Sequence, residues 1–324
     1  MGQTATGDAP SGAALNSLIK DYVGRVEALG VTHLLIPQRW WGNAKEIEAS
    51  SLDCLAMTTH IGAHSQSLQL VTAIHPGFFQ PAAIAKWGAT LSRLTEGRWS
   101  INVTSGWNLS EFSMYGVDAL DHDLRYARSK EFIDVVKGTW SSPKFSYRGK
   151  YYTVRDLVLE PRPVGDLEIF QGGQSAAAIE MACEYSDWMF LNGGSLEKIR
   201  SIIERVRAVA AGGLMPKFAV YGIPLCRNTD EEALQEIQSM LTAADAELIA
   251  TRKKRVSGAE GMWASEDELS LLDSNEGFVT GLIGSPETIL AQIRAFSDIG
   301  VEMFHLMLGD KLFEELVLPD MLGV

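Results

Sequence analysis

The sequence has few cysteines and no long apolar run. Its three cysteines, Cys54, Cys183 and Cys226, lie far apart, and none forms a CxxC pair. This spacing argues against a zinc site or a redox dithiol and suits a reducing compartment. No apolar stretch reaches the roughly 20 residues that span a bilayer. The first residues, MGQTATGDAPSGA, lack the basic and apolar regions of a secretory signal. We therefore expect a cytoplasmic protein.

Basic residues are also scarce. The 324 residues include 28 Lys and Arg against 41 Asp and Glu, so the formal net charge is −13. Nucleic acids and anionic membranes are bound through basic surfaces, so both are poor candidates as partners. Hydrophobic residues make up 46% of the chain, which is enough for a substantial core.

Strand-like and helix-like segments alternate along the chain, which is typical of a parallel sheet covered by helices. This pattern predicts an α/β fold, a TIM-like (β/α) barrel, as one domain over residues 1–324. Strands are expected at 31–36, 68–74, 99–104, 167–171, 188–191, 218–225 and 303–308. Helices are expected at 13–29, 46–60, 81–95 and 123–140.

Three segments depart from a regular barrel. Residues 1–12, expected to be flexible, contain no β-branched apolar run, so the usual first strand is predicted to be absent. Residues 145–154 are expected to form an inserted β-hairpin. The polar segment 240–277 contains the basic run Thr251–Arg255. It is either a solvated helix face or a mobile lid over the barrel mouth.

A glycine-rich turn follows the fourth predicted strand. In FQGGQS, Gly173, Gln174 and Ser175 lead from the strand end into the helix-like AAAIEMA. The backbone amides at a helix start suit a phosphate group, and glycine permits close approach. An ordinary turn with Ser175 as the N-cap explains the sequence equally well.

Polar and aromatic residues at two other strand or helix ends are further candidates. Asn102 lies inside an apolar strand. Its side-chain amide either forms hydrogen bonds within the protein or forms a hydrogen bond to the edge of a planar ligand. Trp107 follows that strand and is suited to wall a pocket. Arg125 and Tyr126 begin a predicted helix, where they either contact a phosphate or lie on an ordinary charged helix start.

Five segments, in this order, resemble the bacterial-luciferase-like FMN-dependent monooxygenase family. They are GRWSINVTSGWNLSEF, HDLRYARSKEF, FSYRGKYYTV with LEPRP after it, EIFQGGQSAAA and GFVTGLIGSPETI. The similarity runs from about residue 31 to the C-terminus and is strongest to the dimethylsulfone and alkanesulfonate monooxygenase branch. The paired GW…EF and HDxRY segments are the most specific part of it.

This resemblance implies a luciferase-type barrel that uses reduced FMN supplied by a separate NAD(P)H-dependent flavin reductase, together with O2. It further implies a homo-oligomer that oxidises a small organosulfur compound, a sulfone or an alkanesulfonate, with cleavage of a carbon–sulfur bond. The alternatives are an amide, heterocycle or natural-product substrate, a flavin-binding protein without turnover, or a deazaflavin-dependent relative. No metal site is expected.

The resemblance also implies which residues contact the flavin. These are Gln38, Arg39, Asn102, Glu111, Arg125, Tyr126 and Ser175. The phosphate argument adds Gly173 and Gln174. Catalytic or substrate-facing roles are predicted for His75, Trp107 and His305, although structural packing is an open alternative for each. Trp40, Trp41 and Phe78 are further candidates for the pocket wall.

Overall fold

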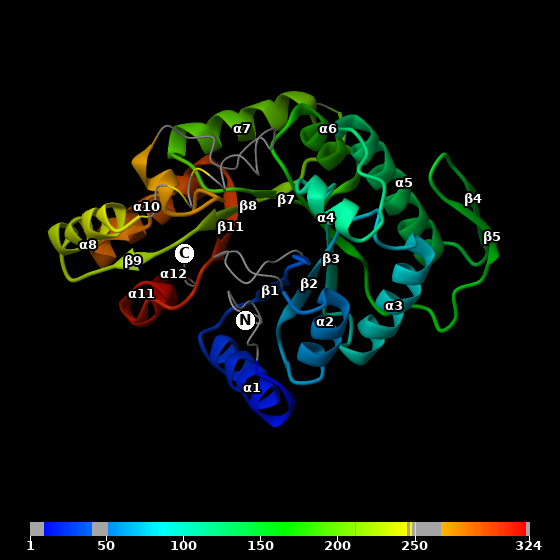
Figure 1. The fold of residues 1–324 in the computed structure, drawn as a ribbon, viewed down its shortest axis with the longest axis horizontal. Helices are drawn as coiled ribbons and strands as arrows, with labels where there is room; N and C mark the ends of the chain where they lie inside the picture. Colours follow the sequence, from blue (N-terminus) through cyan, green and yellow to red (C-terminus); the bar gives the residue numbers. More distant parts are fainter. Residues whose placement is uncertain are drawn as a thin grey trace. The chain divides into compact units, whose positions relative to one another are not determined.

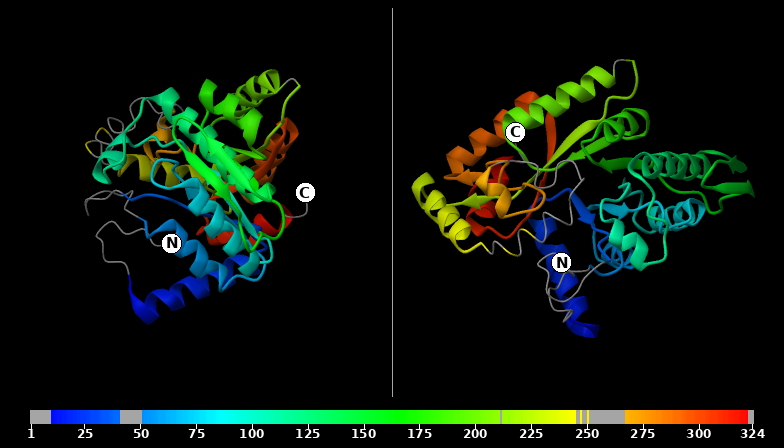
Figure 2. Two further views of the ribbon diagram at one scale, coloured as in Figure 1. Left: turned by 90° about the vertical axis from the view of Figure 1, so that its right-hand side faces the viewer. Right: turned by 45° about the horizontal axis from the view of Figure 1, so that its top comes forward.

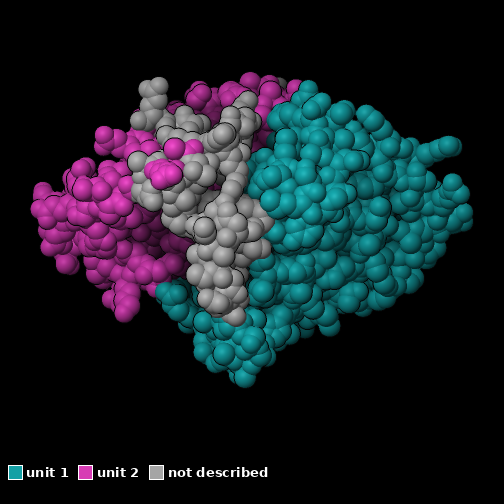
Figure 3. All heavy atoms as spheres, in the orientation of Figure 1, with its two compact units in different colours: residues 1–170 teal, residues 171–324 magenta. Residues whose placement is uncertain are grey.

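The computed structural model describes residues 10–40, 51–210, 212–244, 247, 250 and 267–321. The chain divides into two compact units, unit 1 (Met1–Phe170) and unit 2 (Gln171–Val324), which Figure 3 shows in different colours. Trp41, residues 46–50 of the helix predicted at 46–60, and most of the predicted lid lie outside the described residues.

Unit 1 begins with three parallel strands and their helices. Its elements are α1 (Gly12–Ala28), β1 (His33–Ile36), α2 (Cys54–Gly62), β2 (Gln69–Ile74), α3 (Pro81–Leu94), β3 (Trp99–Val103), α4 (Leu109–Met114), α5 (His122–Ser141), β4 (Phe145–Arg148), β5 (Thr153–Leu157) and most of β6 (Glu168–Gly172). β1 pairs with β2 and β2 with β3, so that Ile36, Thr72 and Ile101 lie side by side.

Side chains alternate between the two faces of these strands. On one face, Trp99 packs against Trp87 of α3 and Trp140 of α5, and its indole N–H donates to Thr72 Oγ1 at 3.0 Å. This face is therefore covered by helices. Asn102 and Ser100 alternate with those residues and point to the opposite face, the one expected to line the barrel interior.

Local signals explain where several of these elements begin and end. α1 stops before Gly30, which adopts a φ of 77°, as predicted for a C′ glycine. Asp53 caps α2 by accepting from the N–H of Ala56 at 2.8 Å. Glu27 Oε1 accepts from the backbone N–H groups of Gln66 and Ser67, which fixes the approach to β2.

The predicted hairpin is confirmed: β4 and β5 pair antiparallel, and they lie alongside α5 in the views of Figures 1 and 2. Gly138 of α5 permits this packing, because a Cβ there would lie 2.0 Å from Cε2 of Phe145. At the turn, the carboxylate of Glu131 accepts from the backbone N–H groups of Lys150, Tyr151 and Tyr152. The hairpin is thus tied to α5 at both ends.

Unit 2 continues the alternation. Its elements are α6 (Ala176–Tyr185), β7 (Trp188–Leu191), α7 (Leu196–Val209), β8 (Lys217–Gly222), β9 (Leu225–Cys226), α8 (Asp230–Thr242), the 3-10 helix η1 (Glu268–Leu271), β10 (Ile283–Gly284), α10 (Pro286–Ile299), β11 (Val301–Leu306), α11 (Lys311–Leu316) and α12 (Leu318–Met321). β7 pairs with β8 and β8 with β11, all parallel. Met189, Ile203, Phe218 and Phe296 are central in its core.

The predicted strands are found as strands, with one correction. The strand expected at 218–225 is wrong as a single element, because β8 ends at Gly222 and the separate β9 pairs with β10. Pro224 has no N–H to donate, and the N–H groups of Ile223 and Leu225 bond to Gly277 and Leu282 instead. Among the described residues, no strand precedes α1, and no helix is long and apolar enough to cross a membrane.

Candidate functional site

Buried polar side chains of unit 1 gather just after the carboxyl ends of β1 and β2. Gln38 Oε1 accepts from the backbone N–H of His75 at 2.8 Å. Glu111 of α4 reaches the same region: its Oε1 accepts from the backbone N–H of Trp40 at 2.7 Å, and its Oε2 lies 3.8 Å from His75 Nδ1. These contacts join three segments that are far apart in the sequence.

Burial controls the charge of this group. The pKa of His75 falls to about 4, first because the ring is buried and second because Arg39 is near, so the imidazole is neutral at pH 7. Burial raises the pKa of Glu111 to about 7, while the Trp40 N–H and Arg39 act in the opposite direction. Near neutral pH the site therefore holds a neutral histidine and a carboxyl group that can gain or lose a proton.

Several polar atoms in this part of unit 1 are buried without a hydrogen-bond partner among the described residues. They include Gln38 Nε2, Trp40 Nε1, His75 Nδ1, Asn102 Oδ1 and Glu111 Oε2. Asn102 is in register with Ala73, two residues before His75. Buried polar atoms are normally satisfied, so a set of donors and acceptors left open marks a place for a polar ligand. A planar heterocycle with N–H and C=O groups on its edge fits this set chemically.

The start of α5 is tied to the same strand ends. Ser105, which follows β3, is hydrogen-bonded to Ser129 at 2.9 Å, and the Ser129 hydroxyl donates to the carbonyl of Arg125. Arg125 donates through Nη1 to the carbonyl of Leu120 at 2.6 Å, while its Nε finds no partner in the described part of the chain. Burial lowers the pKa of this guanidinium. Tyr126 follows it in the first turn, with its ring 4.9 Å from that of His122.

Aromatic side chains enclose this polar group. Trp40 lies 5.4 Å from Phe78 and 5.4 Å from Tyr115, ring to ring, and the Tyr115 hydroxyl donates to the carbonyl of Trp40. Phe112 stacks on His75 at 6.4 Å. Gly106 makes room for Phe112, since a Cβ there would lie 2.5 Å from its ring. Sequence analysis identified Trp40 and Phe78 but missed Phe112 and Tyr115, and it missed α4 as a helix.

Trp107 is half-buried immediately after Gly106. The next residue is Asn108, whose Nδ2 is buried without a hydrogen-bond partner among the described residues. The structure thus places Trp107 in the loop between β3 and α4, between Asn102 and Glu111.

The remaining predicted residues belong to unit 2. Ser175 is the N-cap of α6 and accepts from the N–H of Ala178 at 3.3 Å, which confirms the N-cap interpretation. Gly173 has a φ of 127°, and Gln174 is buried with Nε2 unpartnered among the described residues. His305 of β11 packs 5.5 Å from Phe190 and 5.2 Å from Tyr221.

Comparison with known proteins identifies the family. The family described as luciferase-like monooxygenase matches residues 3–303. This chain belongs to that family. It is similar to the FMNH2-dependent dimethylsulfone monooxygenase of Pseudomonas fluorescens, with 37% identity over 90% of this chain and 84% of the relative. The enzyme of the same name from Pseudomonas putida is 40% identical over 74% of this chain and 69% of the relative.

The family also defines the fold. A crystal structure of riboflavin lyase, solved with a modified FMN, covers 100% of this chain and 89% of its own with a TM-score of 0.78 at 19% identity. The α/β fold of the luciferase-like monooxygenases is therefore confirmed for the chain as a whole. At this identity the likeness concerns the fold alone.

Proposed function

We propose that this luciferase-like monooxygenase is the oxygenase of a two-component system that uses reduced FMN and O2 to oxidise a small organosulfur compound. The observation that carries the proposal is the set of open, buried polar atoms on Gln38, Asn102 and Glu111. The names of the two Pseudomonas relatives support the cofactor and the substrate class. A separate NAD(P)H-dependent flavin reductase would supply the reduced flavin.

The residues present fit FMN in two parts. Gln38, Asn102 and Glu111 offer a donor, an acceptor and a titrating carboxyl to the edge of the isoalloxazine ring. Arg39, whose charge acts on His75 and Glu111, would lie near the ring, and Arg125 and Tyr126 would hold the ribityl phosphate. The turn of Gly173, Gln174 and Ser175 would offer backbone amides to a phosphate at the start of α6.

Bound reduced FMN supplies the two electrons with which one oxygen atom of O2 becomes water while the other is inserted into the substrate. For a sulfone with hydrogen on the α-carbon, breaking the carbon–sulfur bond then leaves a sulfinate and an aldehyde. The chain itself would bind and orient the flavin and the substrate and would exclude water from them. His75, being neutral, would donate a hydrogen bond to a sulfonyl oxygen, and Trp107 and His305 would position the substrate.

The proposal predicts specific products whose molar yields can be measured. With FMN, NADH and a flavin reductase, the purified chain is expected to convert dimethylsulfone to methanesulfinate and formaldehyde in equal amounts, followed by NMR. In ¹⁸O2 one labelled atom should enter the products. Methanesulfonate is the second substrate to try, with sulfite as the product. Oxidation of reduced FMN without consumption of any sulfone or sulfonate would contradict the organosulfur assignment and favour an amide or heterocyclic substrate.

A further inference from the structure

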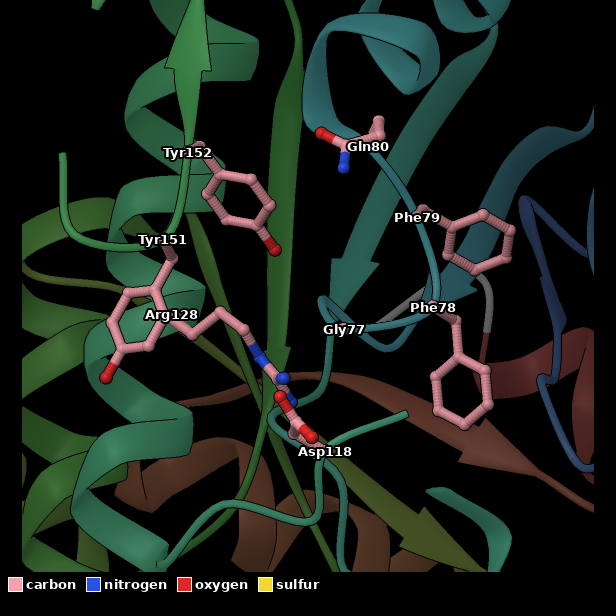
Figure 4. Close-up of a pocket in the computed structure, with 8 residues that line it drawn as sticks. All are labelled: Gly77, Phe78, Phe79, Gln80, Asp118, Arg128, Tyr151 and Tyr152. Atoms are coloured by element: carbon pink, nitrogen blue, oxygen red, sulfur yellow. The ribbon is translucent and has the colours of Figure 1, made fainter. Parts of the chain in front are cut away.

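A pocket in unit 1 lies beside the turn that follows β2, and of its lining residues Phe78 also walls the flavin site proposed above. Its volume is about 270 Å³, and Figure 4 shows its lining. The lining residues are Gly77, Phe78, Phe79, Gln80, Asp118, Arg128, Tyr151 and Tyr152. Pockets for drug-sized ligands start near 300 Å³, so this one suits a molecule of a few heavy atoms.

Arg128 is the unusual member of this pocket. Its side chain is 7% exposed, yet it makes no hydrogen bond or ion pair with any described residue, and its Nε is buried without a partner. The guanidinium is always charged, and burying an unpaired charge costs several kcal/mol. Among the described residues, the Phe112 ring, 5.5 Å from Cζ, and the charge of Asp118 offset part of this cost, but neither pairs with the guanidinium.

The guanidinium rests directly against Gly77. A Cβ on Gly77 would lie 2.6 Å from Cζ of Arg128, so only glycine lets the charged group occupy this place. In Figure 4 the guanidinium and the Tyr152 hydroxyl point toward the same space next to Gly77, whereas the Tyr151 hydroxyl points away. The pocket is thus built around an accessible face of a buried cation.

The surroundings favour an anion with a small apolar part. Within the described ranges, the Tyr152 hydroxyl makes one long hydrogen bond, 3.4 Å, to the carbonyl of Pro76. Burial raises its pKa to about 12, so it remains a donor. Arg125, one helical turn before Arg128, adds positive potential. Phe78 and Phe79 supply apolar walls. Asp118, which is exposed, is the one carboxylate among the lining residues.

We propose that this pocket binds a small organic oxyanion, such as an alkanesulfonate, sulfinate or short carboxylate. Two of its oxygens would pair with the Arg128 guanidinium, and one of these, or the third oxygen of a sulfonate, would also accept from the Tyr152 hydroxyl. The alkyl group would lie against Phe78 and Phe79. Sulfonates, sulfinates and carboxylates share this chemistry. The site is independent of the proposed oxygenase activity and needs no bound flavin.

The test is a ¹⁹F NMR titration of the full, flavin-free chain with trifluoromethanesulfonate. Saturable binding is expected, and Arg128→Met should weaken it at least tenfold. Gly77→Ala is the sharper variant, because it keeps the charge but displaces the guanidinium, and it should weaken binding to a similar degree. Lys137→Met, which removes one exposed charge from the same helix, should leave affinity unchanged. Circular dichroism would establish that each variant is folded.

Competition with the fluorinated probe then distinguishes organic oxyanions from inorganic ones as the ligand. Methanesulfonate, methanesulfinate and acetate should displace the probe at lower concentration than inorganic sulfate or phosphate. Asp118→Asn should tighten binding. Absence of saturable binding, or equal affinity in the wild type and in both Arg128→Met and Gly77→Ala, would overturn the proposal. Stoichiometric displacement by FMN would also overturn it, since the pocket would then hold the flavin phosphate.

Discussion

Replacing Glu111 by alanine is expected to weaken the binding of reduced FMN by about 100-fold. The side chain is fully buried; one oxygen accepts from the N–H of Trp40 and the other is left open toward the proposed flavin. Alanine removes the ligand contact and leaves the Trp40 N–H without an acceptor, which loosens the segment that carries Gln38 and Arg39. Each loss costs about 1–3 kcal/mol, and 2.8 kcal/mol corresponds to about 100-fold. Anaerobic fluorescence titration measures the affinity.

Glu111→Gln is the informative companion variant, because glutamine still accepts from Trp40 but does not titrate. The folded-state pKa of Glu111 is raised to about 7 from an ordinary value of 4.5. The wild type therefore loses stability from this group as the pH rises from about 4.5 through 7, since the buried carboxyl must then ionise. The stability of Glu111→Gln relative to wild type should increase over that window, measured by urea unfolding at pH 5 and pH 8.

Glu180→Gln, on an exposed position of α6, is the control for loss of one carboxylate. It should show no comparable change between the two pH values. A difference between Glu111→Gln and wild type that is the same at pH 5 and pH 8 would contradict the raised pKa. Unchanged flavin affinity in Glu111→Ala would remove Glu111 from the flavin site.

Gly193→Ala is expected to destabilise the protein by about 3–4 kcal/mol. Gly193 is buried in unit 2, and a Cβ there would lie 1.9 Å from the backbone oxygen of Glu276. That backbone is held in place: the Gly193 N–H donates to the carbonyl of Asn275 at 2.8 Å, and the buried Glu276 carboxylate pairs with Lys198. A methyl group forced against backbone that is held in place gives one of the larger losses of stability seen for single substitutions.

The neighbouring glycine provides the control. A Cβ on Gly194 would meet the Lys198 side chain at 2.9 Å, and that flexible chain can move aside. Gly194→Ala should therefore cost less than Gly193→Ala, because a side chain rather than backbone has to shift. Chemical denaturation of the two variants measures both values. Equal effects of the two alanines, or a mild effect at Gly193, would contradict this account of the packing.

Much of the fold was predictable, because its strands are short apolar runs bounded by turns. β1 to β3, the hairpin β4–β5 and the Ser175 N-cap all follow from local sequence. The end of β8 did not, since its cause is a set of hydrogen bonds from Ile223 and Leu225 to residues more than 50 positions away. α4 was missed because six residues with a polar first turn give too short a periodic pattern.

The candidate site was predictable only in part. Gln38, Arg39 and Glu111 were identified by resemblance, and unit 1 brings them together around His75. Arg128 was not singled out, because an arginine in a helix rich in charges is normally solvated. Its burial depends on Gly77 and Phe112, which are distant in sequence. The local sequence around Arg128 contains no signal that predicts these contacts.

The central claim is that the chain binds reduced FMN and that Asn102 and Ser175 each contribute to its affinity. Anaerobic titration of the wild type, Asn102→Leu and Ser175→Asp with reduced FMN tests it most directly. Aspartate keeps the N-cap of α6 but places a negative charge at the proposed phosphate position. Ser195→Asp makes the same change at the N-cap of α7, outside the proposed site. Saturable binding that weakens at least tenfold in Asn102→Leu and Ser175→Asp, but not in Ser195→Asp, is predicted; absence of saturable binding, or wild-type affinity in both site variants, would contradict the claim.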